Sequence, residues 1–145
     1  MEINDISGAV VDSAMKVHSQ LGAGLLEHVY EVCLKHELEK RGLRVRSQVP
    51  VPVTYDGLVF DMGFRIDLLV EDAVIVELKA VEKFLPVHTA QLLTYLKLTK
   101  KPVGLLVNFN VAHLKNGIKR LATEMNTNSG PSSVSSVSSV VGDPR

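Results

Sequence analysis

Two carboxylates and a lysine lie in the middle of this sequence, on segments that are otherwise apolar. In the segment VIVELKAV, alternate side chains of a strand share a face, so Glu77 and Lys79 would point to the same side of a sheet. If the three residues before Val74 form a hairpin loop, counting back along both strands places Asp67 directly opposite Glu77. We therefore expect two carboxylates and an ammonium group to meet on one patch of sheet.

Carboxylates that lie so close repel one another unless one takes up a proton or a cation lies between them. A hard divalent ion, Mg²⁺ or Mn²⁺, accepts oxygen ligands and can activate a water against a phosphodiester. Lys79 would then orient or deprotonate that water, or offset the developing phosphate charge. The alternative is that Glu77 and Lys79 form a solvated salt bridge, which is what a Glu-x-Lys pattern on a strand usually forms. Because a core strand favours apolar residues where Glu77 and Lys79 stand, the sequence favours a functional site.

Two helices are predicted before these strands. Apolar residues every three or four positions indicate an amphipathic helix over 4–21, with Asn4 or Asp5 as its N-cap. A glycine-containing link leads to a second helix over 25–41, and Gly42 stands where a left-handed residue is expected after it.

Strands follow from position 45 onward. The alternating segment 45–55 predicts one half-buried strand, which its two prolines make irregular or confine to a sheet edge. Asp56 and Gly57 form a turn, and the central hairpin follows with strands over 64–70 and 74–80.

The last elements complete an α/β pattern. A helix is predicted over 87–99, and the apolar run 103–109 indicates a strand buried on both faces. The segment 113–125 is ambiguous between strand and helix, because Gly117 interrupts it. The expected fold is an α/β arrangement with a mixed central β-sheet flanked by helices.

Composition sets the domain organisation and narrows the class of protein. The chain has 145 residues, of which 46% are hydrophobic and 22% charged, so we expect one folded domain over 1–125. The Ser/Val-rich segment 126–145 is predicted to be a disordered tail. The single cysteine, Cys33, excludes an internal disulfide and a cysteine-based zinc cluster. No apolar stretch reaches the roughly 20 residues of a membrane span, and we expect a cytoplasmic protein.

Sixteen basic and sixteen acidic residues give no net formal charge. A general electrostatic attraction to nucleic acid is therefore absent, and any contact with a polyanion must be local. This weighs against a passive DNA coat protein, and less against an enzyme whose acidic metal ligands offset its own basic groups.

Several ordered motifs together resemble a known family. In chain order they are GAGLLEHVYEVCLKHEL, VPVTYDG, FRIDLLVEDAVIVELKAV, HTAQLLTYLKLT and VGLLVNF. With these motifs the sequence is similar to the GxxExxY proteins, whose name describes Gly24, Glu27 and Tyr30 here, and through them to the PD-(D/E)xK, restriction-endonuclease-like superfamily. The resemblance covers about residues 5–122.

The resemblance implies a role for each acidic position. Asp67 and Glu77 would be metal ligands for Mg²⁺ or Mn²⁺, with the backbone carbonyl of Leu78 as a candidate third ligand. Lys79 would be the catalytic lysine, and Glu27 the acidic residue that an N-terminal helix contributes to the site and to the metal.

The resemblance also implies two residues on the later helix. Gln91 and Tyr95 match a Gln-x-x-x-Tyr motif that lies beside the active site in RecB-type and lambda-exonuclease-like nucleases, and their spacing puts both on one helix face. The proline of the superfamily name is absent, since Ile66 precedes Asp67. Tyr30 could bond into the site or belong to the core.

The function expected from these observations is metal-dependent hydrolysis of phosphodiester bonds in nucleic acid, with DNA as the expected substrate. The rival is a catalytically silent nuclease-derived module that binds nucleic acid or a protein partner. A domain of this size offers little surface to surround a duplex, which makes a homo-oligomer the expected assembly.

Overall fold

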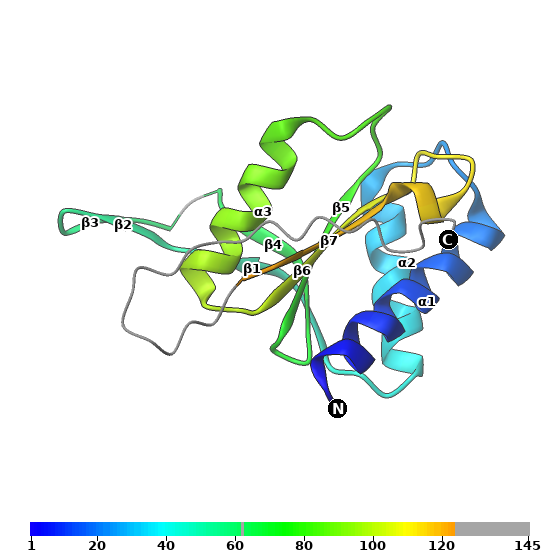
Figure 1. The fold of residues 1–145 in the computed structure, drawn as a ribbon, viewed down its shortest axis with the longest axis horizontal. Helices are drawn as coiled ribbons and strands as arrows, with labels where there is room; N and C mark the ends of the chain where they lie inside the picture. The colour runs from blue at the N-terminus through cyan, green and yellow to red at the C-terminus, as the bar shows by residue number, and fades with distance from the viewer. Residues whose placement is uncertain (62, 124–145) are drawn as a thin grey trace.

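A five-stranded mixed sheet forms the centre of the fold, with helices on both of its faces (Figure 1). The computed structural model describes residues 1–61 and 63–123, so the predicted tail over 126–145 lies outside the described residues. None of the described helices combines the length and apolar composition needed to cross a membrane. In chain order the elements are α1 (Ile3–Leu21), α2 (Glu27–Lys40), β1 (Val45–Pro50), β2 (Val53–Tyr55), β3 (Leu58–Phe60), β4 (Arg65–Val70), β5 (Val74–Lys79), α3 (Pro86–Thr99), β6 (Val103–Asn108), the 3₁₀ turn η1 (Leu114–Gly117) and β7 (Ile118–Ala122).

The strand order in the sheet is β1-β4-β5-β6-β7. The pair β5–β6 is parallel and the other neighbours are antiparallel, which confirms the mixed sheet. A parallel pair needs a long crossover connection, and α3 supplies it between β5 and β6. The observed architecture is therefore the predicted α/β fold.

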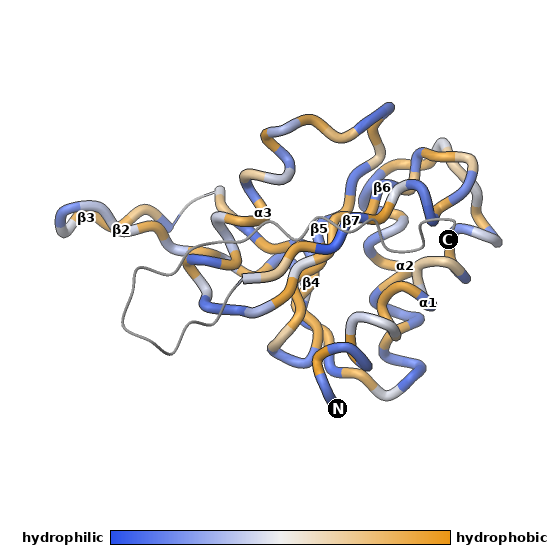
Figure 2. The backbone as a smooth tube through the Cα atoms, viewed as in Figure 1, coloured by the Kyte–Doolittle hydropathy of each residue, from blue (hydrophilic) through white to orange (hydrophobic). Residues whose placement is uncertain are grey.

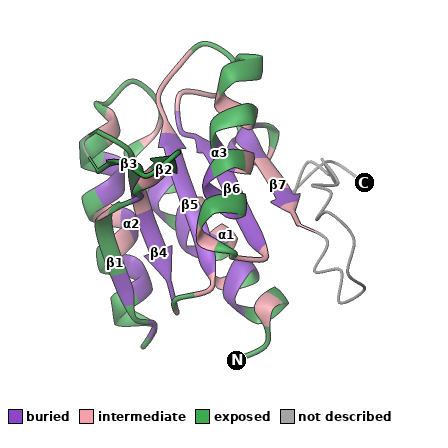
Figure 3. Ribbon diagram, turned by 90° about the vertical axis from the view of Figure 1, so that its left-hand side faces the viewer, coloured by how far each residue is buried: buried purple, intermediate pink, exposed green. Residues whose placement is uncertain are grey.

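Two apolar layers enclose the sheet. The first lies between the sheet and α1 and α2, and includes Val74, Val76 and Leu78 of β5. The second lies under α3 and includes Ile75 of β5. Hydrophobic residues run through the central strands in Figure 2, and β4, β5 and β6 are mostly buried in Figure 3. Because side chains alternate along β5, Glu77 and Lys79 share the face of Ile75, which α3 covers.

The segment predicted as one strand over 45–55 is divided in the structure. Its first part, β1, is an edge strand as the prolines require, but Val53–Tyr55 pairs with Leu58–Phe60 in a separate two-stranded hairpin. This hairpin extends away from the sheet in Figure 1. The break falls at Val51, whose side chain is buried and whose N–H bonds the carbonyl of Phe64. Pro52 follows and has no N–H to continue a ladder.

The ends of the first two helices differ slightly from the sequence prediction. The N-cap of α1 is Glu2, not Asn4 or Asp5, and the Asp5 carboxylate accepts the Glu2 backbone N–H at 3.2 Å. The second helix begins at Glu27, two residues later than predicted. Gly42 has φ of +86°, which confirms the predicted left-handed residue after that helix.

The ambiguous segment after β6 contains both kinds of structure. A 3₁₀ turn ends at Gly117 and β7 begins at Ile118. A Cβ atom at Gly117 would collide with the carbonyl oxygen of Asn108, so the interruption in the sequence pattern is a close approach of two backbones.

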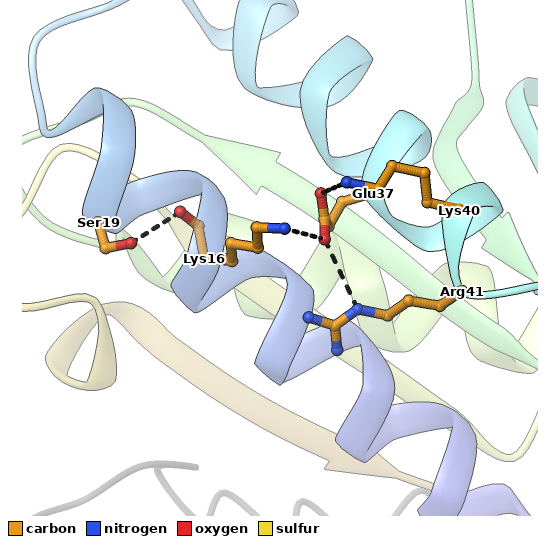
Figure 4. Close-up of polar contacts among 5 residues, drawn as sticks. All are labelled: Lys16, Ser19, Glu37, Lys40 and Arg41. Carbon is orange, nitrogen blue, oxygen red and sulfur yellow. Dashed lines mark hydrogen bonds and ion pairs between the residues drawn. The ribbon is translucent and has the colours of Figure 1, made fainter.

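A cluster of ion pairs joins α1 to α2 (Figure 4). The largely buried Glu37 carboxylate of α2 lies 3.0 Å from Nζ of Lys16 on α1. It also contacts Lys40 at 3.7 Å and Arg41 at 3.8 Å, both within or just after its own helix. This cluster ties the C-terminal half of α2 to α1.

Candidate active site

Asp67 and Glu77 are linked by reciprocal hydrogen bonds between neighbouring strands. The Glu77 carboxylate accepts the backbone N–H of Asp67 at 2.8 Å. The Asp67 carboxylate accepts the backbone N–H of Leu78 at 2.8 Å. Val70 pairs with Val74 as predicted, and the backbone pairing continues to Leu68 and Val76, the residues next to Asp67 and Glu77. The hairpin loop therefore fixes which two carboxylates meet.

Burial makes this pair electrostatically unfavourable when both groups are ionised. Glu77 is 4% exposed, and desolvation together with the nearby Asp67 charge raises its pKa from 4.5 to about 8. Burial also raises the pKa of Asp67, although the Leu78 N–H and the Lys79 charge act in the opposite direction. The pair therefore holds a proton near neutral pH, or needs another positive charge.

Lys79 and Glu27 complete the charged group. The half-buried Lys79 ammonium is close enough to lower the pKa values of Asp67, Glu77 and Glu27. Burial raises the pKa of Glu27, and the Asp67 charge adds to this effect. Charges carried by α2, β4 and β5 therefore influence one another's pKa values.

The loop before α2 explains the position of Glu27. The Tyr30 hydroxyl accepts the Leu25 N–H at 3.1 Å and donates to the Gly22 carbonyl, while Gly24 has φ of +98°. Tyr30 is fully buried, so it belongs to the core and fixes the loop rather than bonding into the acidic group. Glu27 follows as the first helical residue.

A comparison with protein-family profiles matches residues 4–121 to the PD-(D/E)XK nuclease superfamily. The chain belongs to the PD-(D/E)XK nuclease superfamily. Searches of curated proteins and of solved structures found no significant match. The matched residues include all or nearly all of α1, α2, α3 and each strand of the five-stranded sheet, so the acidic group lies within the nuclease-like core.

Metals typical of the superfamily would meet oxygen donors here. Carboxylates are the ligands that Mg²⁺ and Mn²⁺ prefer, and the crowding of Asp67 and Glu77 is relieved by a cation, so the donor chemistry fits. In the described parts of the chain, however, no three or more Asp, Glu, His or Cys side chains converge as a metal-holding group. One oxygen of each central carboxylate instead accepts a main-chain N–H.

Of the two residues expected from the later helix, only Tyr95 is electrostatically linked to the acidic pair. Tyr95 is buried, and its pKa is raised by burial and by the charges of Glu77 and Asp67. Gln91 lies one turn earlier and is exposed. Within the described residues it has no hydrogen bond to the acidic group. His88 caps α3, since its Nδ1 accepts the Leu85 N–H at 3.0 Å.

Two further polar residues, for which the sequence predicted no role, join the site. Glu31 is buried, and its pKa is raised by burial and by the Asp67 charge. Gln48 bonds both Glu31 and Asp67. The spacing of Glu27 and Glu31, one helical turn, was a signal for the first of these. The sequence carried no comparable signal for Gln48.

A third such residue fixes the chain after Lys79. Asn108, buried at the end of β6, accepts the Val81 N–H at 3.1 Å and donates to the Val81 carbonyl at 2.8 Å. The Phe109 N–H also bonds the Lys79 carbonyl at 2.9 Å. A buried amide at the end of an apolar strand was a detectable signal. These bonds hold the end of β5 that carries Lys79.

Proposed function

We propose that this protein hydrolyses phosphodiester bonds in nucleic acid, with DNA as its substrate and Mg²⁺ or Mn²⁺ as its cofactor. Within the superfamily, we assign it to the GxxExxY proteins. The spacing of Gly24, Glu27 and Tyr30 supports this assignment, since the glycine and the tyrosine both shape the loop that precedes Glu27.

The observation that carries the proposal is the pair formed by the buried Glu77 and the partly buried Asp67 beside Lys79. A scaffold gains nothing from two carboxylates that repel at such a position, because each also loses hydration energy. Their arrangement has a purpose if a divalent cation takes the place of the proton that Glu77 otherwise holds. Membership of a nuclease superfamily supplies the matching chemistry.

Each residue then has a distinct role. Asp67 and Glu77 would hold the ion, with Glu27 and the Leu78 backbone carbonyl as further oxygen donors. The bound ion would supply Lewis-acid stabilisation of the charge that develops on the phosphate. Lys79 would orient the attacking water and offset the same charge. Tyr95 would limit water access from the α3 side, and Gln91, which is exposed one turn before Tyr95, would contact the substrate.

The substrate must be bound locally, because the sixteen basic and sixteen acidic residues give no net charge. A chain of this size covers only one side of a duplex. Two copies facing each other across the DNA would enclose it, and this is the assembly we propose.

The test is cleavage of labelled single- and double-stranded DNA and RNA by the full chain, with Mg²⁺, with Mn²⁺ and with EDTA. We expect metal-dependent cleavage of DNA by the wild type, and its loss in Glu77→Gln and Asp67→Asn. Both amides keep an oxygen that can accept the main-chain N–H, so both variants should fold. Glu82→Gln makes the same chemical change at an exposed position and should cleave as the wild type does.

The second candidate function is binding without turnover. It is favoured by the main-chain N–H groups that already occupy one oxygen of each central carboxylate. A wild type that binds DNA in fluorescence anisotropy but cleaves no substrate with either metal would replace the nuclease proposal with this one. Cleavage by Glu77→Gln at the wild-type rate would reject the assigned site.

A further inference from the structure

Gln48 has an unusual backbone conformation opposite Asp67. It lies on the edge strand β1, where Ser47 pairs with Leu68 and Val49 pairs with Ile66, so that Gln48 faces Asp67 across the strands. Its φ is +54°, in the left-handed region that residues with a Cβ rarely adopt. Such conformations persist where the surrounding structure needs them, and they are concentrated at functional sites.

The Gln48 side chain bridges two acidic residues from different elements. Its Nε2 lies 2.9 Å from Oε1 of Glu31 on α2 and 3.4 Å from Oδ1 of Asp67 on β4. An amide nitrogen carries two hydrogens, so it can donate to both carboxylates at once. Gln48 is therefore the donor between two acidic groups that would otherwise face each other.

We propose that Gln48 is a positioning residue, which holds the Asp67 carboxylate in a fixed orientation by tying it to Glu31. This inference rests on the proposed function of Asp67 as a metal ligand. Glu31 lies on α2, outside the sheet, and its hydrogen bond with Gln48 connects it to Asp67.

Both carboxylate oxygens of Asp67 accept a hydrogen bond in this arrangement. Its Oδ2 accepts the Leu78 N–H, and its Oδ1 accepts the Gln48 amide. Two donors from different strands fix the plane of a carboxylate, as the outer hydrogen-bond partners of metal ligands commonly do. Without the amide, only the Leu78 bond would orient Asp67, and Glu31 would repel it directly.

The test uses Gln48→Gly in the full chain. Glycine removes the amide and is compatible with the positive φ, so the variant should fold with little change in melting temperature. Ser47→Gly, at the neighbouring exposed position of β1, is the matched control. We expect Gln48→Gly to bind Mn²⁺ about tenfold more weakly or worse in calorimetry, which is the usual cost of losing an outer partner of a ligand. Ser47→Gly should bind as the wild type does.

A second measurement needs no metal. Hydrogen exchange of the Leu78 amide, measured by NMR with the Leu105 amide as internal reference, reports how firmly Asp67 is held. We expect faster exchange of Leu78 in Gln48→Gly and no change in Ser47→Gly. If Gln48→Gly does not fold, Gln48→Asn tolerates the same backbone but is one methylene too short to bridge, and the same changes are expected.

The two measurements separate this inference from the proposed function. A wild type that binds no Mn²⁺ contradicts the proposed function, and the exchange of Leu78 then decides the role of Gln48. Unchanged exchange of Leu78 in the variant overturns the positioning role, whatever the metal affinity. Faster exchange together with weaker Mn²⁺ binding supports it, and faster exchange with unaltered Mn²⁺ binding limits Gln48 to holding Asp67 without any effect on the metal.

Discussion

Tyr30 of α2 stacks on Phe109, the residue directly after β6, with ring centroids 4.4 Å apart and planes inclined by 8°. The stacked ring places the Tyr30 hydroxyl under the loop before α2, where it bonds the backbone at Leu25 and Gly22. This contact connects the core to the loop that positions Glu27.

Tyr30→Phe should therefore separate the packing role of the Tyr30 ring from the role of its hydroxyl in positioning the loop before Glu27. The ring stays stacked, but the Leu25 N–H and the partly exposed Gly22 carbonyl lose their hydrogen-bond partner, so we expect a loss of about 1 kcal/mol in unfolding free energy. Urea unfolding measures this loss. We also expect weaker Mn²⁺ binding, because Glu27 is less well placed. Tyr55→Phe makes the same change at an exposed position in β2 and should leave metal binding unchanged. Normal metal binding by Tyr30→Phe would contradict the positioning role.

Without divalent metal, the protein should become less stable as the pH rises through neutrality. The folded-state pKa of Glu77 is about 8, above its usual 4.5, so the folded state holds a proton that the unfolded state has lost. The stabilisation that Glu77 contributes is therefore fully present below about pH 4.5, and it is lost as the pH rises through about 8. We expect a loss on the order of a few kcal/mol from this group between about pH 5 and about pH 9.

Glu77→Gln should remove this pH dependence, because the amide resembles the protonated acid. Urea unfolding of both proteins in EDTA, at several pH values, compares the two profiles. We expect the variant to be at least as stable as the wild type at high pH. Parallel profiles for the two proteins would show that Glu77 is ionised in the folded state throughout.

Lys79→Ala should affect the chemical step more than metal binding. Removing a positive charge beside the carboxylates does not remove a ligand, so Mn²⁺ affinity should be unchanged or higher. We expect DNA cleavage to slow about a hundredfold or more, since the lost group stabilises charge in a poorly solvated site. Single-turnover cleavage and calorimetry measure the two effects. Lys83→Ala removes the same charge from an exposed position nearby and serves as the control.

Glu37→Gln should destabilise the contact between α1 and α2. The ion pair with Lys16 lowers the pKa of Glu37, so its stabilisation is present above the usual value of 4.5 and is lost as the pH falls through the lowered value. At neutral pH and low salt, we expect a small drop in melting temperature that high salt reduces. Below that pH window the variant and the wild type should melt together. Glu39→Gln, at an exposed position on the same helix, should have no such effect.

The sequence by itself determined the elements and the register that depend on local chemistry. Three loop residues fix the pairing of Val70 with Val74, and strand geometry then places Asp67 opposite Glu77. Alternation put Glu77 and Lys79 on one face, and the helix predicted over 87–99 is α3, which begins one residue earlier at Pro86. These predictions held because each depends on neighbours within a few residues.

The sequence did not reveal that the segment 45–55 forms two separate strands. The apolar alternation of Val49, Val51 and Val53 would look the same if the segment formed a single strand. Only the packing of Val51 and its bond to Phe64 decided that the chain leaves the sheet there. Tertiary contacts therefore overrode a periodic pattern, as they commonly do for strands.

Only the tertiary structure decided the pKa values of the carboxylates and which further residues contact them. Burial raises the pKa of Glu77 to about 8, and burial is a property of the packed fold rather than of a sequence window. Gln48 reaches Glu31 and Asp67 across separations of 17 and 19 residues. Its role follows from β1 lying beside β4 with α2 packed against both, a juxtaposition that local propensity does not encode. The sequence thus specified the central carboxylates, and the fold specified how they are charged and what holds them.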